Sequence, residues 1–179
     1  MLDWSGFLKE MKDKDTGWWA FRGVCNAEYS LLPSIGRPNA RHQGYSAEWE
    51  REIFERFKRQ ALPFMPTSPL DDFGWMAVAQ HHGLPTRLLD WSRSPMVAAY
   101  FAAYAPPGAD PDMAFTIYGY ETTTLKAENT AVVTSPFDIP RKFVEVHIAH
   151  YVPRIPAQHG FFTVQSDPCK PLSVGPRSS

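Results

Sequence analysis

Residues 80–95 read Gln-His-His-Gly-Leu-Pro-Thr-Arg-Leu-Leu-Asp-Trp-Ser-Arg-Ser-Pro, and this stretch carries the strongest structural signals in the chain. Gly83 is expected in the C′ position of a helix that ends here, because that position favours the left-handed conformation that glycine adopts easily. Residues 84–89 predict a turn followed by a short strand. Ser94 and Pro95 form an N-cap and N1 pair. We therefore expect a helix, a turn, a strand and a second helix in quick succession.

Two helices are predicted directly ahead of this stretch, and the second runs into it. Ser46 is a suitable N-cap for a helix that ends near Ala61, because apolar residues recur every fourth position along one face. The charged residues of this helix, Glu50 among them, fall on the opposite face and predict a solvated surface. The aspartates at positions 71 and 72 are candidate caps of a further helix over residues 73–82.

The rest of the chain contains runs of β-branched and aromatic residues. Residues 18–24 form a dense apolar stretch with Arg22 inside it, which predicts a buried strand. Residues 96–105 are apolar almost all round and predict a buried helix. Four further strands are predicted over residues 113–120, 130–134, 142–149 and 161–165. Helices early and strands late favour an α+β fold with a largely antiparallel sheet.

The two ends of the chain differ in character. Residues 2–12 predict a short amphipathic helix with Asp3 near its cap, and we expect this helix to cover one side of the core. Residues 167–179 are rich in proline and serine and predict a loosely ordered tail. The length of 179 residues suits a single domain, which we place at residues 1–166.

Composition and charge exclude several functional classes. Lys and Arg number 18 against 19 Asp and Glu, so the chain lacks the basic excess of a dedicated duplex-DNA binder. No apolar run approaches the roughly 18 residues that span a bilayer, so we expect a soluble, cytoplasmic protein. Cys25 and Cys169 are too few for a disulfide framework or a thiolate zinc site.

Several motifs resemble those of the FRG domain family. The first is the Phe-Arg-Gly run that gives the family its name, here Phe21, Arg22 and Gly23. The other three are Leu32, Pro33 and Ser34; residues 80–102; and residues 154–161. The resemblance extends over about residues 18–162. Val24 and His82 depart from it, since many members keep Gln and Tyr at these positions.

The order of the motifs is similar to that of the ADP-ribosyltransferase fold, with its split, largely antiparallel sheet flanked by N-terminal and central helices. Arg22 corresponds to the first motif, Ser92 to the second and Gln158 to the third, so the resemblance implies these three as catalytic residues. It also implies NAD as the substrate, a macromolecular acceptor, and a role as a toxin or in phage conflict, with a possible antitoxin partner.

The chemistry of NAD cleavage suits these residue types. Arg22 is expected to hold a phosphate, and Gly23 to let the backbone approach the carboxamide. Tyr100 or Trp91 is expected to stack on the nicotinamide ring, and Ser92 to orient Gln158 or the ribose hydroxyls. The remaining cofactor-binding candidates are His81 and Arg87. Gln158 is neutral, so we consider Glu145 and Glu121 as sources of negative charge for the developing cation.

Structural alternatives remain open for each of these residues. Arg22 is equally suited to a buried ion pair with Asp90 or Glu145. Ser92 and Ser94 suit the cap of the following helix. The remaining alternatives are an Arg87 pair with Asp90 that fixes the turn, a Gln158 side chain that binds loop backbone, and a His81 side chain satisfied in the core.

Two rival functions also remain. A non-catalytic module that binds a nucleotide or a peptide would use the same fold, and the neutral Gln158 favours it. A metal hydrolase is disfavoured, because the histidines show no ligand spacing of the HExxH kind, and we expect no metal site.

Overall fold

The protein is an α+β structure built on a five-stranded antiparallel sheet. The computed structural model describes residues 3–12, 14, 18–38, 44–104, 114–122, 133–140, 142–148 and 160–174. Within these residues the helices are α1 (Trp4–Met11), η1 (Ser34–Gly36), α2 (Ala47–Ala61), η3 (Leu62–Phe64), α3 (Asp72–His81) and α4 (Pro95–Ala103). The strands are β1 (Trp19–Val24), β2 (Leu88–Ser92), β3 (Thr116–Glu121), β4 (Phe143–Val146) and β5 (Gly160–Gln165).

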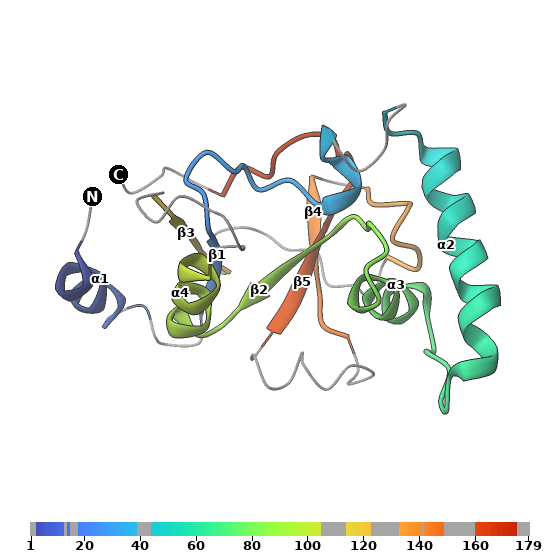
Figure 1. Cartoon of the computed structure of the whole chain (residues 1–179), viewed down its shortest axis with the longest axis horizontal. Coiled ribbons are helices and arrows are strands. Elements are labelled where there is room, and N and C mark those ends of the chain that lie inside the picture. Colours follow the sequence, from blue (N-terminus) through green and yellow to red (C-terminus); the bar gives the residue numbers. More distant parts are fainter. Residues whose placement is uncertain are drawn as a thin grey trace.

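The strands lie in the order β3-β1-β2-β5-β4, and each neighbouring pair is antiparallel (Figure 1). β1 pairs with β3 along its whole length, and β2 does the same with β5. The central junction is different, because β1 meets β2 only where Phe21 lies opposite Ser92. The sheet therefore consists of two well-paired parts that are joined at one position.

One face of the sheet packs against α2 and α3. Its core is made from apolar side chains of the two helices and of β2, β4 and β5, including Phe54, Met76, Leu88, Val144 and Phe162. All of α3 from Phe73 to Ala79 is buried. This explains why α3 shows no amphipathic pattern, since a helix enclosed on several sides is apolar all round.

The other face of the sheet is covered by loops. Trp91, Tyr120, Phe143 and Phe161 form a second core with two residues of the C-terminal segment, Leu172 and Val174. The Leu172 N–H also donates to the Leu31 carbonyl at 2.9 Å. This part of the segment that was predicted to be a loose tail is thus packed on the sheet, and residues 175–179 lie outside the described part.

The predicted helix caps are confirmed. The side chains of Asp3, Ser46, Asp71 and Ser94 each accept a hydrogen bond from a backbone N–H in the first turn of α1, α2, α3 and α4. Gly83 has a φ of 86°. Its N–H donates to the Gln80 carbonyl and the Leu84 N–H to the Ala79 carbonyl, which is the Schellman pattern that ends a helix.

Two expectations about burial were wrong. α1 has no buried residue, and Figure 1 shows it standing to the side of the sheet. α4 is apolar but only partly buried: Ala98 and Ala102 face β1, whereas Tyr100 is 64% exposed. Its apolar composition therefore marks a helix with one enclosed face and one face rich in exposed aromatic rings.

Three of the four late strands are confirmed, with shorter bounds for β3 and β4. Residues 133 and 134 are described and are not in a strand, and the rest of the strand predicted over 130–134 lies outside the described residues. In the part of the chain that the structure describes, no helix has the length and apolar character needed to cross a bilayer.

Candidate functional site

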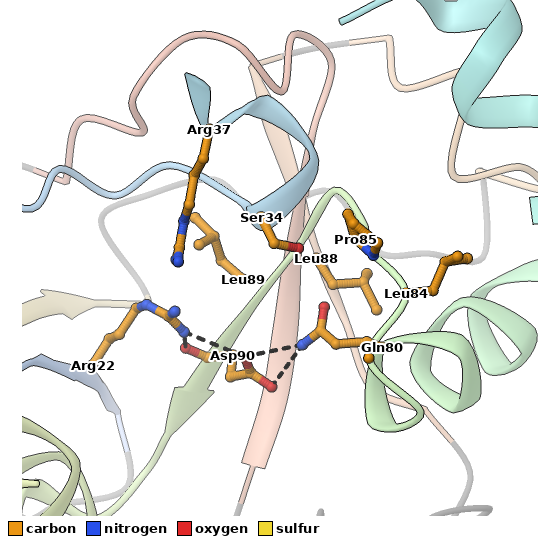
Figure 2. Close-up of a pocket in the computed structure, with 10 residues that line it drawn as sticks. Arg22, Ser34, Arg37, Gln80, Leu84, Pro85, Leu88, Leu89 and Asp90 are labelled. Atoms are coloured by element: carbon orange, nitrogen blue, oxygen red, sulfur yellow. Dashed lines mark hydrogen bonds and ion pairs between the residues drawn. The ribbon is translucent and has the colours of Figure 1, made fainter. Parts of the chain in front are cut away.

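The candidate site lies where β1 and β2 part. Arg22 follows Phe21, the last residue of β1 to pair with β2, and its guanidinium extends toward β2 (Figure 2). Its Nη1 donates to the Asp90 carbonyl oxygen at 2.6 Å and lies 3.4 Å from Asp90 Oδ2. The Arg22 side chain thus bonds the Asp90 carbonyl of β2, which a backbone N–H of β1 would bond if the two strands paired continuously.

A cavity of about 280 Å³ opens beside this contact. Its polar side chains come from β1, η1, the end of α3 and β2, and its apolar wall comes from the turn before β2 and from β2 itself. The lining residues are Arg22, Ser34, Arg37, Gln80, Gly83, Leu84, Pro85, Leu88, Leu89 and Asp90.

Asp90 is the centre of a polar network in this cavity. The Gln80 amide nitrogen lies 3.0 Å from each of the two Asp90 carboxylate oxygens. The Thr86 hydroxyl donates to the Gln80 carbonyl oxygen, and because an ionised carboxylate only accepts, the Gln80 NH₂ must face Asp90. The carboxylate is therefore fixed from two sides, by Gln80 and Arg22, while its side chain remains 49% exposed.

η1 is tied to the start of β2 and brings Arg37 to the cavity. The Ser34 hydroxyl accepts from the Thr86 N–H at 3.0 Å and donates to the Thr86 carbonyl at 3.2 Å. Arg37 follows η1 and anchors its Nε on the Leu32 carbonyl at 3.2 Å. Figure 2 shows the end of the Arg37 side chain directed toward the Arg22 guanidinium.

The two arginines make this cavity electropositive. Burial lowers the pKa of Arg37, and the nearby charge of Arg22 lowers it further. Among the described residues, no carboxylate pairs with Arg37 within 4 Å, whereas Arg22 has Asp90. Two guanidiniums that face one cavity favour an anion between them, since the planar fork of arginine suits phosphate and carboxylate oxygens.

Of the three predicted catalytic residues, the structure describes two. Arg22 lines the cavity and also pairs with Asp90, as the alternative predicted, but the pair is not buried because the Asp90 side chain is half exposed. Ser92 is buried opposite Phe21, and its hydroxyl accepts from the Ser94 N–H at 3.0 Å. The capping alternative holds for Ser94, which is the N-cap of α4, whereas Ser92 orders the turn before it. Gln158 lies outside the described residues, so its position relative to the other two remains a prediction.

Two predicted cofactor-binding residues have structural roles. A Cβ added to Gly23 would lie 1.9 Å from the Ala98 carbonyl oxygen, so this glycine is required for the close packing of β1 against α4. Trp91 is buried in the second core, and its Nε1–H donates to Thr163 at 2.9 Å. Trp91 therefore cannot stack on a ligand ring as predicted.

Tyr100 and His81 lie outside the cavity. Tyr100 is exposed on α4, beside Tyr104, with ring centroids 6.1 Å apart. His81 is exposed at the end of α3 and packs edge-on against His82, although its neighbour Gln80 lines the cavity. His81 is therefore neither a cavity residue nor a core residue.

Arg87 corrects two expectations at once. It is 3% exposed and pairs with Glu50 of α2, which is 2% exposed, through Nε to Oε1 at 2.8 Å and Nη2 to Oε2. Arg87 thus binds neither a cofactor nor Asp90, and Glu50 does not belong to a solvated face. The Pro136 carbonyl accepts a hydrogen bond from Nη1 of Arg87, and the Tyr45 hydroxyl accepts a second one from Nη2.

The electrostatics of this buried pair follow from its surroundings. Burial alone lowers the pKa of Arg87, but the hydrogen bond and the charge of Glu50 outweigh it and raise that pKa. Burial and the hydrogen bond to Glu50 raise the pKa of Tyr45 as well. The group links the N-terminal half of α2 to the start of β2, the strand that carries Asp90.

Glu145 lies in a separate polar group. Tyr120 donates to its carboxylate at 2.8 Å, and Arg93 lies 3.7 Å from it. Glu121 stands opposite Trp19 in the register of β3 and β1, and neither glutamate lines the cavity. Among the described residues there is no cluster of three or more His, Cys, Asp or Glu side chains that suits a metal ion.

Sequence reasoning missed three side chains of the cavity: Ser34, Arg37 and Gln80. Ser34 and Gln80 stand in motifs that were recognised, but nothing local assigns them a role. Arg37 lies among prolines and glycines in a segment that predicts only a surface loop, and the contacts that place it involve residues far away in the sequence.

A protein-family model described as the FRG domain matches residues 17–110, just over half of the chain. All ten residues that line the cavity lie within this range. No curated protein and no solved structure matches the chain.

Proposed function

The chain belongs to the FRG domain family, and from this membership and the cavity we propose that it is an ADP-ribosyltransferase-like enzyme that uses NAD to modify a macromolecule. The observation that carries the proposal is the convergence of Arg22 and Arg37 on a cavity at the point where β1 and β2 part. Two guanidiniums suit the diphosphate of a dinucleotide.

The proposed reaction breaks the bond between the nicotinamide nitrogen and ribose C1′. Its electron pair leaves with nicotinamide, and a nucleophile of the acceptor bonds to C1′ and gives up its proton. The transition state resembles an oxocarbenium ion, which a nearby negative charge stabilises. Asp90 is the carboxylate that the cavity itself provides, and it takes the place that we had assigned to Glu145 or Glu121.

The proposal assigns the remaining groups as follows. Arg22 and Arg37 hold the diphosphate, and Gln80 keeps the Asp90 carboxylate in position. Ser92 is the last residue of β2, and its hydroxyl accepts a hydrogen bond from the Ser94 N–H in the turn that leads to α4. Its proposed role is to fix the shape of this turn. Gln158 keeps its proposed role as a partner of the ribose 2′-hydroxyl.

Incubation with labelled NAD and a cell lysate tests the proposal. We expect label transfer and nicotinamide release with the wild type and at least a tenfold loss with Arg22→Gln, which keeps a donor for the Asp90 carbonyl but removes the charge. Arg56→Ala, an exposed arginine on α2, is the matched control and should leave the rate unchanged. Equal rates for the wild type and Arg22→Gln would refute the site.

Activity in the cell offers a second readout. A cytoplasmic toxin or phage-conflict enzyme would modify the macromolecules of its own cell unless an inhibitory partner covers the cavity. Expression of the wild type should then arrest growth, and expression of Arg22→Gln should not. Growth arrest by both proteins would show that the toxicity does not depend on Arg22 and this cavity.

A non-catalytic binding module is the second candidate. It is favoured by the state of two predicted catalytic groups, because Arg22 already pairs with Asp90 and the Ser92 hydroxyl already accepts a hydrogen bond. Calorimetry distinguishes the two functions. Binding of NAD without any release of nicotinamide would support the module, whereas slow turnover by the wild type alone would support the enzyme.

A further inference from the structure

The cavity carries groups of opposite charge side by side. Arg22 and Arg37 contribute two positive charges, and Asp90 contributes one negative charge. In a site for a simple anion, a carboxylate would repel the bound phosphate. In a site for a cation, two arginines would repel the bound ligand in the same way. The lining therefore suits a ligand that has an anionic end and a neutral end that donates hydrogen bonds.

Asp90 is prepared to accept such hydrogen bonds. Gln80 holds both carboxylate oxygens at 3.0 Å, so the plane of the carboxylate is fixed, and about half of the side chain is exposed. An ionised carboxylate has about four acceptor positions, of which Gln80 occupies two and the 3.4 Å contact with Arg22 a third. Two positions are available to hydroxyls when Arg22 binds an anion in place of this carboxylate oxygen. Two hydroxyls on adjacent carbons form the donor arrangement that a carboxylate accepts in parallel, as at the ribose of dinucleotide-binding sites.

The size and the apolar wall limit the ligand further. A volume of about 280 Å³ lies at the lower end of ligand pockets, which run from roughly 300 to 1,000 Å³, so the cavity holds one portion of a dinucleotide. Leu84, Pro85 and Leu88 offer a wall for carbon-bound hydrogens. Figure 2 shows Asp90 between the Arg22 guanidinium and the Gln80 amide, so the hydroxyl acceptor adjoins the anion-binding end.

We propose that this cavity is a ribose phosphate subsite, in which Arg22 and Arg37 bind the phosphate and Asp90, positioned by Gln80, binds the two ribose hydroxyls. The proposal rests on the proposed function for the choice of a nucleotide, and it adds the specificity-determining residue. It requires the 2′-hydroxyl, so a deoxyribose ligand loses one of its two contacts with Asp90.

NMR titration with ribose 5-phosphate and 2-deoxyribose 5-phosphate tests this, because the method detects even millimolar affinity. For the wild type we expect at least tenfold tighter binding of the ribose compound, since a site built for a hydroxyl rejects the analogue that lacks it. Asp90→Asn should reduce this preference to less than threefold. Arg37→Ala should weaken both sugar phosphates by about the same factor and keep the preference.

Gln80→Leu gives an independent variant that leaves Arg22 and Asp90 in place. It should reduce the preference for ribose by weakening ribose 5-phosphate more than 2-deoxyribose 5-phosphate, because the ribose compound has two contacts that depend on the orientation of the carboxylate and the deoxyribose compound has one. Circular dichroism and the thermal midpoint show whether each variant is folded, and Arg56→Ala is the matched control for charge. Should Asp90→Asn not fold, Gln80→Leu decides the question.

The outcomes separate this proposal from the enzymatic one. Preference for ribose without turnover of NAD would retain the subsite and refute the transferase. Turnover of NAD without any preference between the two sugar phosphates would refute the subsite and retain the transferase. Failure of both sugar phosphates to bind, or a preference that persists in Asp90→Asn and in Gln80→Leu, would also overturn the subsite.

Discussion

Asp90 and Glu50 are both acidic residues within reach of an arginine, yet their environments give them different roles. Asp90 is half exposed and shares Arg22 with a cavity, so its charge remains available to a ligand. Glu50 is enclosed with Arg87, and every nitrogen of that guanidinium group donates a hydrogen bond to a protein atom. Exposure, more than residue type, separates the carboxylate that we propose to bind a ligand from the structural one.

Loss of one partner of the buried pair should be costly. Arg87→Met leaves Glu50 charged and unpaired in the interior, so we expect the free energy of unfolding to fall by about 3–5 kcal/mol. The double variant Glu50→Leu with Arg87→Met should recover most of that loss, because both charges are then removed. Urea unfolding followed by circular dichroism measures both changes.

Arg51 supplies the matched control for this prediction. It forms an exposed ion pair with Asp138, at 3.2 Å, and such pairs contribute about 0–1 kcal/mol. Arg51→Met should therefore change the unfolding free energy by less than about 1 kcal/mol. A loss in Arg87→Met as small as that in Arg51→Met would show that the buried pair is not a major stabilising contact.

The residues of the site show how far local sequence reasoning extends. Arg22 was predicted as a site residue through the resemblance to the FRG family, and the contact with Asp90 that was kept as its structural alternative is present in the structure. Glu50 and Arg87 were assigned incorrectly, since helical periodicity places Glu50 among other charged residues and does not indicate a partner 37 positions away. Arg37 was missed for the same reason, because its placement depends on the distant contact of Ser34 with Thr86.

Elements were easier to predict than contacts. Caps and turn residues act within a few positions, so the helices and the end of α3 at Gly83 followed from the sequence. Burial of whole elements did not, because composition alone does not reveal which face of α4 meets β1 or that α1 lies off the sheet. The short pairing of β1 with β2 was likewise invisible, since it depends on the register of distant strands.

The packing of α4 on β1 depends on the absence of a side chain at Gly23. Gly23→Ala would place a Cβ 1.9 Å from the Ala98 carbonyl and 2.6 Å from the Ala102 nitrogen, so the helix must move. We expect a loss of about 1–3 kcal/mol in unfolding free energy, as for other overpacked sites. In Gly119→Ala the nearest atom would be 3.4 Å away, an ordinary contact, and thermal unfolding should show little change. Equal losses would refute the close-packing role.

α1 contributes little to the core, and its removal should show this. We expect a chain that lacks residues 1–12 to unfold with a free energy within about 1 kcal/mol of the full chain, because none of the residues of α1 is buried. Lys14 is kept, since it lies over the Trp19 ring at 4.9 Å. Urea unfolding measures the difference, and a loss of several kcal/mol would mean that α1 packs on the fold in solution.

At the scale of the whole molecule, two tyrosines in different parts of the fold are each bonded to a carboxylate. Tyr45, just before α2, donates to Glu50 of α2, and Tyr120 of β3 donates to Glu145 of β4. Burial and the adjacent carboxylate raise the pKa of both hydroxyls well above the ordinary value near 10. Both tyrosines are thus neutral in the folded protein when exposed tyrosines ionise.

This arrangement sets the behaviour of the protein in alkali. A raised pKa in the folded state leaves stability unaffected below the unfolded pKa near 10, and stability is lost as the pH rises above it, because the unfolded chain then releases protons that the folded chain retains. We expect the urea midpoint to fall above pH 10. Tyr120→Phe should reduce the steepness with which the urea midpoint falls as the pH rises. If both Tyr120→Phe and Tyr45→Phe leave this pH dependence unchanged, the loss of stability in alkali does not come from these two tyrosines.

The single pairing of Phe21 with Ser92 has a mechanical consequence for the cavity. In the described part of the sheet, no backbone pairing joins β1 to β2 beyond that point. Widening the gap between them there disrupts the side-chain bonds of Arg22 to Asp90 and leaves the ladders of the other strand pairs intact. A ligand that binds Arg22 in place of Asp90 would therefore remove the side-chain bonds between β1 and β2 at the cavity without breaking a backbone hydrogen bond of the sheet. The junction of β1 and β2 is therefore the part of the sheet that the fewest backbone pairs hold closed.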